Sequence, residues 1–447
     1  MKKIKNVRTA ALDGLLAIEK NQAYSNLLLH SLIEKNNIKD KDIGLLTELV
    51  YGTLQRKMTL DYFLTPFLNQ KKIDLWVRVL LRMSLYQMVY LDRIPDRAVL
   101  FEAVEIAKSK GHKGIASFVN GILRNIQRRG LPSISEIKDD LERISIQSST
   151  PKWLVRRLVN QYGIEKTEKI CMSQLEAPKQ TARVNGNKTN VSELLEMLKK
   201  EGIEATAGDI VPFAIKIEKG NVANTETFEK GFVTVQDESS MLVAKALHIE
   251  EGDHVLDSCA APGGKTTHIA EMLGNTGRVV SIDLHEHKVK LIEGHAKRLG
   301  LQNIETKAID SRNILDHYPK ESFDKILVDA PCTGFGVIRR KPEIKYTKTE
   351  KDITALANIQ FDILRAVAPL LKPGGILVYS TCTIDQEENS DVIKAFLSGQ
   401  PDFEKDHTLE ERMPDKVKSY IKEGELQILP HYFESDGFYI QALRKKV

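Results

Sequence analysis

Apolar residues return every three or four positions through most of the first 130 residues. This spacing is clear at residues 11–18, 28–33 and 43–68, and it is typical of helices that bury one face. Residues 75–91 are apolar nearly all round, which predicts a buried helix. Gly130-Leu131-Pro132 then ends the last helical pattern. The pattern predicts a compact bundle of several helices.

Residues 131–230 mix helical and strand patterns. We expect a small α+β module here, and the pattern does not assign its topology. The expected helices are residues 152–161, 164–174 and 191–201, and the expected strands are residues 181–184, 213–217 and 232–235.

From residue 236 onward, strand patterns alternate with amphipathic helical patterns. This order predicts a parallel, doubly wound sheet. Two further strand patterns, at residues 426–429 and 437–443, indicate an antiparallel pair that closes one edge. The expected parallel strands are residues 254–259, 278–283, 304–309, 325–329 and 376–381, and the expected helices are residues 264–273, 285–299, 350–371 and 386–398.

The predicted fold class is therefore multidomain. We expect an all-α domain at residues 1–135, a small α+β module at residues 136–235 and an α/β Rossmann-like domain at residues 236–447.

Charge is distributed unevenly between these parts. Residues 1–130 hold 22 basic and 12 acidic residues, a net charge of +10, whereas the rest of the chain holds 43 and 49, a net charge of −6. A basic module beside a mildly acidic one is typical of a protein that binds a polyanion such as nucleic acid. Lysines on solvated helix faces are the alternative explanation.

Targeting signals are absent from the pattern. No apolar stretch reaches the roughly 20 residues of a membrane span, and no apolar core follows the basic start Met1-Lys2-Lys3-Ile4-Lys5. We therefore expect a cytoplasmic protein that has no membrane partner.

The chain contains four cysteines, Cys171, Cys259, Cys332 and Cys382. They form no Cys-x-x-Cys pair, and no histidine cluster accompanies them, so we expect neither a metal site nor a disulfide framework.

A run of small residues, Cys259-Ala260-Ala261-Pro262-Gly263-Gly264-Lys265-Thr266, follows the first strand of the α/β domain. Small residues let the backbone approach a ligand at a helix N-terminus. A phosphate-binding P-loop would need glycine at position 259, and the dinucleotide fingerprint Gly-x-Gly-x-x-Gly is missing. A phosphate cradle is therefore disfavoured.

Acidic residues mark the ends of four successive strands: Asp257, Asp283, Asp310 and Asp329. Asp283 lies 20 positions after Gly263, a spacing that lets a carboxylate accept hydrogen bonds from ribose hydroxyls, and Asp310 is placed to meet an adenine edge. One such Asp alone is usually a cap or turn residue. Four along one sheet edge favour a nucleoside cofactor, and the missing phosphate grip favours S-adenosylmethionine.

Two cysteines follow neighbouring strands, Cys332 in Asp329-Ala330-Pro331-Cys332 and Cys382 in Ser380-Thr381-Cys382. A single cysteine at a strand end is usually a small buried apolar residue. Two that face one crevice suit methylation of cytosine carbon 5, because a thiolate that adds to carbon 6 makes carbon 5 nucleophilic. A second group must then remove the carbon 5 proton, so two cysteines can share these tasks. The attacking thiol needs a pKa below the free value of about 8.5, and Asp329 is placed to hydrogen-bond the base.

These motifs resemble the NOL1/NOP2/Sun family of RNA cytosine-5 methyltransferases. The first 130 residues also resemble the NusB-type helical RNA-binding fold, so the resemblance spans nearly the whole chain. The motifs that carry it are Cys259–Thr266, Asp329–Cys332, Gly334, Gly336, Arg339–Glu343, Ser380–Cys382, Glu387–Asn389 and Asp436–Tyr439.

The resemblance implies a role for each of these motifs in a class I methyltransferase. Cys382 matches the family's nucleophile, and Cys332 matches the cysteine that assists release. The implied substrate is one cytidine of 16S ribosomal RNA, naked or in a partly assembled small subunit, and we expect a monomer. Residues that match the family's S-adenosylmethionine contacts are Cys259, Ala260, Ala261, Pro262, Gly263, Gly264, Lys265, Asp283, Asp310 and Asp329.

Arg339, Arg340 and Lys341 are expected to hold RNA phosphates near the crevice. A solvated basic loop is the alternative.

Three other functions remain open. A cytosine-5 methyltransferase for tRNA or another ribosomal RNA site shares the chemistry, but the helical N-terminal module favours the 16S substrate. A NusB-like RNA-binding factor with an inactive methyltransferase half would not need the intact cysteine pair. An oxidoreductase with a nucleotide-binding fold is disfavoured by the missing glycine fingerprint.

Overall fold

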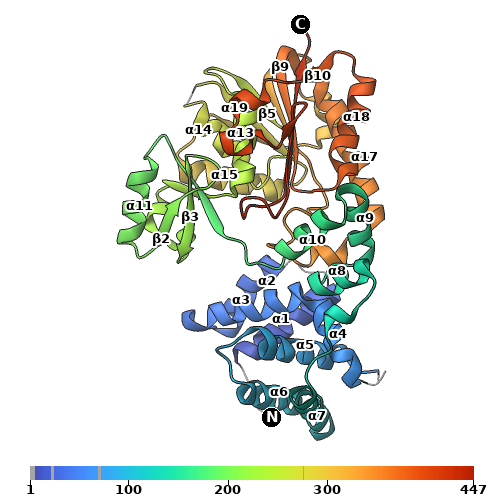
Figure 1. Ribbon diagram of the computed structural model, residues 1–447. Coiled ribbons are helices and arrows are strands. Elements are labelled where there is room, and N and C mark those ends of the chain that lie inside the picture. Colours follow the sequence, from blue (N-terminus) through green and yellow to red (C-terminus); the bar gives the residue numbers. More distant parts are fainter. Residues whose placement is uncertain (1–5, 22–24, 69–71, 275) are drawn as a thin grey trace. The chain divides into compact units, whose positions relative to one another are not determined.

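The computed structural model describes residues 6–21, 25–68, 72–274 and 276–447, so the basic segment at residues 1–5 lies outside the described residues. The chain forms two compact units. The first contains the chain up to Ala177 together with Ile338–Lys348, and the second contains Pro178–Val337 and Thr349–Val447. Figure 1 shows the N-terminal part of the first unit in blue to green, and the segment Ile338–Lys348 of the same unit in orange.

Helices build the first unit, as the apolar periodicity predicts. The expected long pattern over residues 43–68 is two helices, because Arg56 leaves helical geometry at φ −110°, ψ 19°. Helix α5 (Leu75–Tyr90) is buried along most of its length. The other helices of this unit are α1 (Val7–Asn21), α2 (Ser25–Asn36), α3 (Asp40–Gln55), α4 (Lys57–Leu68), α6 (Asp96–Lys110), α7 (Lys113–Arg129), α8 (Asp140–Ser148), α9 (Lys152–Tyr162), α10 (Ile164–Ser173) and the one-turn α16 (Ile344–Thr347).

The segment Ile338–Lys348 is anchored in this helical unit by buried polar contacts. Lys345 Nζ donates to the carbonyl oxygens of Gln55 at 2.9 Å and Ser148 at 3.3 Å. Burial lowers the pKa of Lys345 to about 7. A short stretch that follows the Cys332 loop therefore belongs to the N-terminal unit.

A small antiparallel sheet opens the second unit. Its strand order is β2-β3-β1-β4, with β1 (Gln180–Val184) at the inside between β3 (Ala214–Lys219) and β4 (Val233–Val235). The apolar pattern predicts these three strands and α11 (Val191–Lys200), but not β2 (Glu204–Ala207). That strand is missed because it lies at the edge and its side chains are mostly exposed.

A nine-stranded mixed sheet forms the rest of the second unit. The order is β11-β12-β13-β9-β8-β5-β6-β7, and β10 pairs with β13. The predicted parallel strands and the antiparallel closing pair are present. Their bounds are β5 (His254–Asp257), β6 (Arg278–Asp283), β7 (Ile304–Ala308), β8 (Phe323–Asp329), β9 (Leu371–Thr381), β10 (Phe403–Lys405), β11 (Ile421–Lys422), β12 (Glu425–Ile428) and β13 (Phe438–Lys445).

Helices cover both faces of this sheet, because alternate strand residues point to two cores. Val255 packs in the core that includes α13 and α14, and Leu256 packs in the core that includes α17 and α18. The expected helix at residues 386–398 begins as a short 3₁₀ turn. The helix bounds are α13 (Glu238–Ala246), α14 (Gly264–Met272), α15 (Glu286–Leu299), α17 (Glu350–Val367) and α18 (Ser390–Gly399).

One helical stretch, Glu350–Leu370, is long and apolar enough to cross a membrane by length and composition alone. It packs against α18 and β8 in the second unit, and its apolar residues Ile363, Leu364 and Val367 belong to the core there. Packing within the fold accounts for its composition.

The strand order places the site. From β5 the chain runs outward through β6 and β7, and then returns to the other side of β5 with β8 and β9. Ligands of such sheets bind where the strand order reverses, at the carboxyl ends of the strands.

Candidate active site

Cys332 and Cys382 lie together at the carboxyl ends of β8 and β9. The two strands pair in parallel with Asp329 opposite Ser380, so both following loops start from the same edge. The Sγ atoms are 3.3 Å apart, and both side chains are partly exposed. The structure therefore brings the two sulfurs into one place.

The contact between the two thiols changes the pKa of Cys332. The hydrogen bond with Cys382, together with burial, raises the pKa of Cys332 well above its usual value. The protonated form of Cys332 is therefore favoured beside Cys382.

Lys265 adds a positive charge on the same side. Its Nζ lies 2.7 Å from Asp329 Oδ2, and Ser380 Oγ donates to Asp329 Oδ1 at 2.8 Å. Burial alone would lower the pKa of Lys265, but the charges of Asp329 and Cys382 outweigh burial and raise it. The ammonium group therefore stays charged where it favours a thiolate. The sequence assigns Lys265 only to the cofactor, and its pairing with Asp329 appears only in the fold.

The Cys332 loop is held by Glu388, a residue that the sequence places in a motif without giving it a role. Glu388 is fully buried and accepts from the Thr333 amide at 2.8 Å and from the Thr333 hydroxyl. Gln360 Nε2 donates to the same carboxyl at 3.1 Å. Burial raises the pKa of Glu388 to about 7. Its motif, Glu387-Glu388-Asn389, is the only sequence signal for this contact.

Gly336 lets three loops meet beside the cysteines. Its amide donates to the Cys382 carbonyl at 3.0 Å, and its carbonyl accepts from the Gly437 amide at 2.9 Å. A Cβ at this position would come within 2.0 Å of the Gly437 oxygen. Glycine is required here because two backbones approach too closely for a side chain.

The small-residue loop turns tightly before α14. Gly263 has φ +105°, a conformation that favours glycine. Thr266 Oγ1 donates to Asp257 Oδ2 at 2.7 Å. Burial raises the pKa of Cys259 to about 12, so this thiol stays protonated. The loop is therefore a rigid backbone surface at a helix N-terminus rather than a nucleophilic site.

The acidic residues take the positions that their spacing predicts. Asp257, Asp283 and Asp329 end β5, β6 and β8, and Asp310 comes two residues after β7, where it caps the next turn. Burial raises the Asp257 pKa to about 7, against the opposing effect of hydrogen bonds from Thr266 and the Cys259 amide. Acids at three neighbouring strand ends, beside the glycine turn at the N-terminus of α14, fit a nucleoside ligand that carries positive charge.

The predicted RNA-contact residues lie in the segment that packs with the helical unit. Arg339 is buried, with 4% of its surface exposed, whereas Arg340 and Lys341 are partly exposed. Cys171 is fully buried in α10 of the same unit. Within the described ranges, no cluster of three or more His, Cys, Asp or Glu residues has the arrangement of a metal site.

Three family models match the chain, and together they cover most of it. The NusB family matches residues 5–128, and a ferredoxin-like domain of RsmF/B-like methyltransferases matches residues 150–223. The model described as 16S rRNA methyltransferase RsmB/F matches residues 244–444.

Full-length relatives and solved structures agree with these matches. The probable ribosomal RNA small subunit methyltransferase B of Bacillus subtilis is 56% identical over 442 residues, which cover 99% of each chain. The crystal structure of PH0851 is 26% identical, covers 100% of both chains and has a TM-score of 0.82. NSun6 from Pyrococcus horikoshii, solved with the S-adenosylmethionine analogue SFG, is 26% identical, with a TM-score of 0.59 over 66% of this chain and 98% of that chain.

High identity over the full length, the matching order of the three domains and the cysteine pair at the carboxyl ends of β8 and β9 lead to one conclusion. The chain belongs to the RsmB/F family of S-adenosylmethionine-dependent ribosomal RNA methyltransferases.

Proposed function

We propose that this protein methylates carbon 5 of one cytidine in 16S ribosomal RNA through a covalent cysteine adduct. The observation that carries the proposal is the 3.3 Å separation of the Cys332 and Cys382 sulfurs. Two thiols side by side, one of them with a raised pKa, suit an addition followed by an elimination. The relative from Bacillus subtilis, named as a small subunit ribosomal RNA methyltransferase, supports the substrate class.

In the proposed reaction, a thiolate on Cys382 forms a bond to cytosine carbon 6, and the electrons of the 5,6 double bond make carbon 5 nucleophilic. S-adenosylmethionine, when bound, supplies the methyl group that carbon 5 takes. Asp329 and Lys265 orient the base and favour the thiolate. The residues that would hold the cofactor are Cys259, Ala260, Ala261, Pro262, Gly263, Gly264, Lys265, Asp283, Asp310 and Asp329.

Release then requires a base at carbon 5. In the proposed release step, the Cys382 sulfur is bonded to carbon 6 and no longer hydrogen-bonds to Cys332, and Cys332 first loses its own proton to solvent. The Cys332 thiolate next takes the carbon 5 proton, the 5,6 double bond reforms, and Cys382 leaves as a thiolate. In this scheme Cys382 is the nucleophile, and Cys332 is the group that removes the carbon 5 proton.

The proposal also includes the RNA-binding surface and the cellular location of the protein. The basic NusB-type unit binds ribosomal RNA, either naked or in a partly assembled small subunit, and Arg340 and Lys341 add phosphate contacts. Arg339 is the weaker member of this set because its side chain is buried. The protein acts in the cytoplasm as a monomer.

Trapping the adduct tests the chemistry. Cys332→Ala should accumulate a protein–RNA adduct that survives a denaturing gel, because addition proceeds and elimination stops. The matched control is Cys332→Ala/Cys382→Ala, which should form no adduct and bind the cofactor as before. Cys382→Ala alone should lower methyl transfer by at least about 10³-fold. Normal turnover of Cys382→Ala would contradict the covalent mechanism.

Bisulfite sequencing of RNA from a strain without this gene identifies the substrate. Loss of one methylcytosine in 16S ribosomal RNA is expected. Loss in a tRNA or at another ribosomal site would favour the alternative substrate instead.

A further inference from the structure

A buried arginine of the small antiparallel sheet contacts the helix that follows the small-residue loop. Arg183 lies on β1 and is 1% exposed. The sequence pattern places this residue only in a short strand, and none of the proposed catalytic steps uses it. A fully buried guanidinium is costly unless it is paired, so its partners show what it stabilises.

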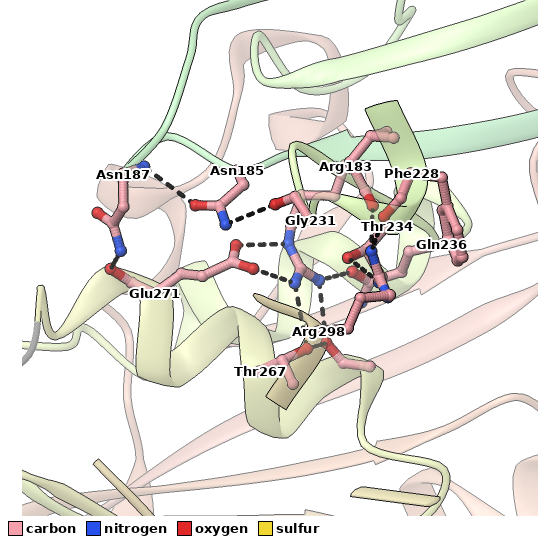
Figure 2. Close-up of polar contacts among 12 residues, drawn as sticks. Arg183, Asn185, Asn187, Phe228, Gly231, Thr234, Gln236, Thr267, Glu271 and Arg298 are labelled. Carbon is pink, nitrogen blue, oxygen red and sulfur yellow. Dashed lines mark hydrogen bonds and ion pairs between the residues drawn. The ribbon is translucent and has the colours of Figure 1, made fainter. Parts of the chain in front are cut away.

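All five N–H groups of Arg183 are engaged, as Figure 2 shows. Nε and Nη2 form a two-point contact with the Glu271 carboxylate, at 3.0 and 2.9 Å. Nη2 also donates to Thr267 Oγ1 at 3.2 Å. Nη1 donates to the Gly264 carbonyl at 2.9 Å and to Gln236 Oε1.

Three of these four partners belong to one helix. Gly264 is the first residue of α14, Thr267 lies one turn later, and Glu271 is near its end. Asn187, which follows β1, donates to the Glu271 carbonyl at 3.0 Å and adds a second contact from the same sheet. The small sheet therefore holds α14 along its whole length.

The first turn of α14 is also where the proposed cofactor loop ends. Gly263 and Gly264 present the backbone there, and Lys265 reaches Asp329 at 2.7 Å. Rotation of α14 would move the loop backbone and the Lys265 ammonium together. The planar guanidinium fork opposes this rotation, because its two-point contact with Glu271 and its bond to Gly264 have fixed relative directions.

We propose that Arg183 is a positioning residue that holds α14 and the adjoining small-residue loop in the geometry that binds S-adenosylmethionine. The small sheet then supports the cofactor site. This inference rests on the proposed cofactor site, so its test first measures whether the unaltered protein binds a cofactor-type ligand.

The chain offers a matched control in Arg298, drawn in the same view (Figure 2). Arg298 at the end of α15 joins the same small sheet, through the Phe228 carbonyl at 2.7 Å, the Val233 carbonyl at 3.0 Å and Thr234 Oγ1 at 3.0 Å. These three hydrogen-bond partners lie at residues 228–234, and none of them belongs to α14. Substitution by lysine at either position keeps the positive charge but removes the planar set of guanidinium N–H donors.

Calorimetric titration with S-adenosylhomocysteine, on the full chain, is the experiment. Arg183→Lys should weaken affinity by about tenfold or more, as expected for a lost bidentate contact, and Arg298→Lys should change it less than twofold. Thermal unfolding should show both variants folded, and hydrogen exchange should be faster in α14 only for Arg183→Lys. No binding by the unaltered protein would contradict the proposed cofactor site itself.

A second variant keeps the proposal testable if Arg183→Lys fails to fold. Arg183→Met/Glu271→Leu removes both buried charges and keeps apolar volume, which often preserves stability. This variant should fold, and its affinity for S-adenosylhomocysteine should be lower than that of the unaltered protein, because the guanidinium contacts to α14 are absent. Unaltered affinity in either Arg183 variant, or an equal loss in Arg298→Lys, would overturn the positioning role.

Discussion

The side-chain carboxyl group of Glu388 is buried within the second unit, and its protonation is linked to the stability of the fold. Burial raises its pKa from 4.5 to about 7 in the folded chain. The folded state therefore binds the proton more tightly, so the stabilisation is fully present below pH 4.5 and is lost as pH rises through about 7. Asp257, whose pKa is also raised to about 7, acts in the same direction.

Glu388→Gln mimics the protonated side chain and should flatten this dependence. We expect the Tm of the variant to fall less than that of the unaltered protein between pH 5 and pH 8, by a few degrees. Thermal unfolding at four pH values measures it. Asp391→Asn, an exposed carboxyl on α18, is the control and should leave the slope unchanged. Equal slopes for Glu388→Gln and the unaltered protein would show that Glu388 is ionised in both states.

At the scale of elements, the cysteine loops depend on close contact between backbones. Gly336→Ala should displace the Cys332 loop, because the added Cβ meets the Gly437 carbonyl oxygen at 2.0 Å. We expect kcat to fall by about 10²-fold, since a displacement of about 1 Å can have that effect. Affinity for S-adenosylhomocysteine should change little. Steady-state kinetics and calorimetry separate the two.

The control for this prediction is Gly294→Ala, in the exposed middle of α15, where a Cβ meets no atom within 4 Å. It should leave kcat unchanged and slightly stabilise the helix. Full activity in Gly336→Ala would mean that the cysteine loops tolerate movement.

At the scale of the whole molecule, the chain leaves the second unit after Val337 and returns to it at Thr349. The intervening segment is held by Lys345 and by Tyr346, whose hydroxyl contacts the Leu54 carbonyl at 3.1 Å. The helical unit is thus joined to the Cys332 loop by a short covalent connection, besides the connection near Ala177. The excess of positive charge in the helical unit predicts the electrostatics of RNA binding.

Arg124→Ala/Arg128→Ala, on the exposed end of α7, should make RNA binding less sensitive to salt. The slope of log affinity against log salt should become shallower by up to about 1.4, at roughly 0.7 for each lost phosphate contact. Filter binding of 16S ribosomal RNA over a salt series measures this slope. Lys219→Ala/Lys394→Ala, two exposed lysines of the second unit, provides the matched control. Identical slopes in the two double variants would place the RNA surface elsewhere.

The sequence by itself determined the elements and most of their positions. Helical and strand periodicities depend on neighbouring residues, so α5, β5, β6 and the antiparallel closing pair are readable from the chain. The location of the strand-end acids and the two cysteines at one edge of the sheet can also be predicted from the sequence, because parallel strands align their carboxyl ends.

Only the tertiary structure decided which distant groups meet. Arg183 and Glu271, Glu388 and Thr333, and Lys345 and Gln55 are 88, 55 and 290 residues apart in the chain. Local periodicity carries no record of such pairings, because they arise from the order of strands and the packing of helices. The edge strand β2, the order of the small sheet and the membership of residues 338–348 in the helical unit were decided in the same way.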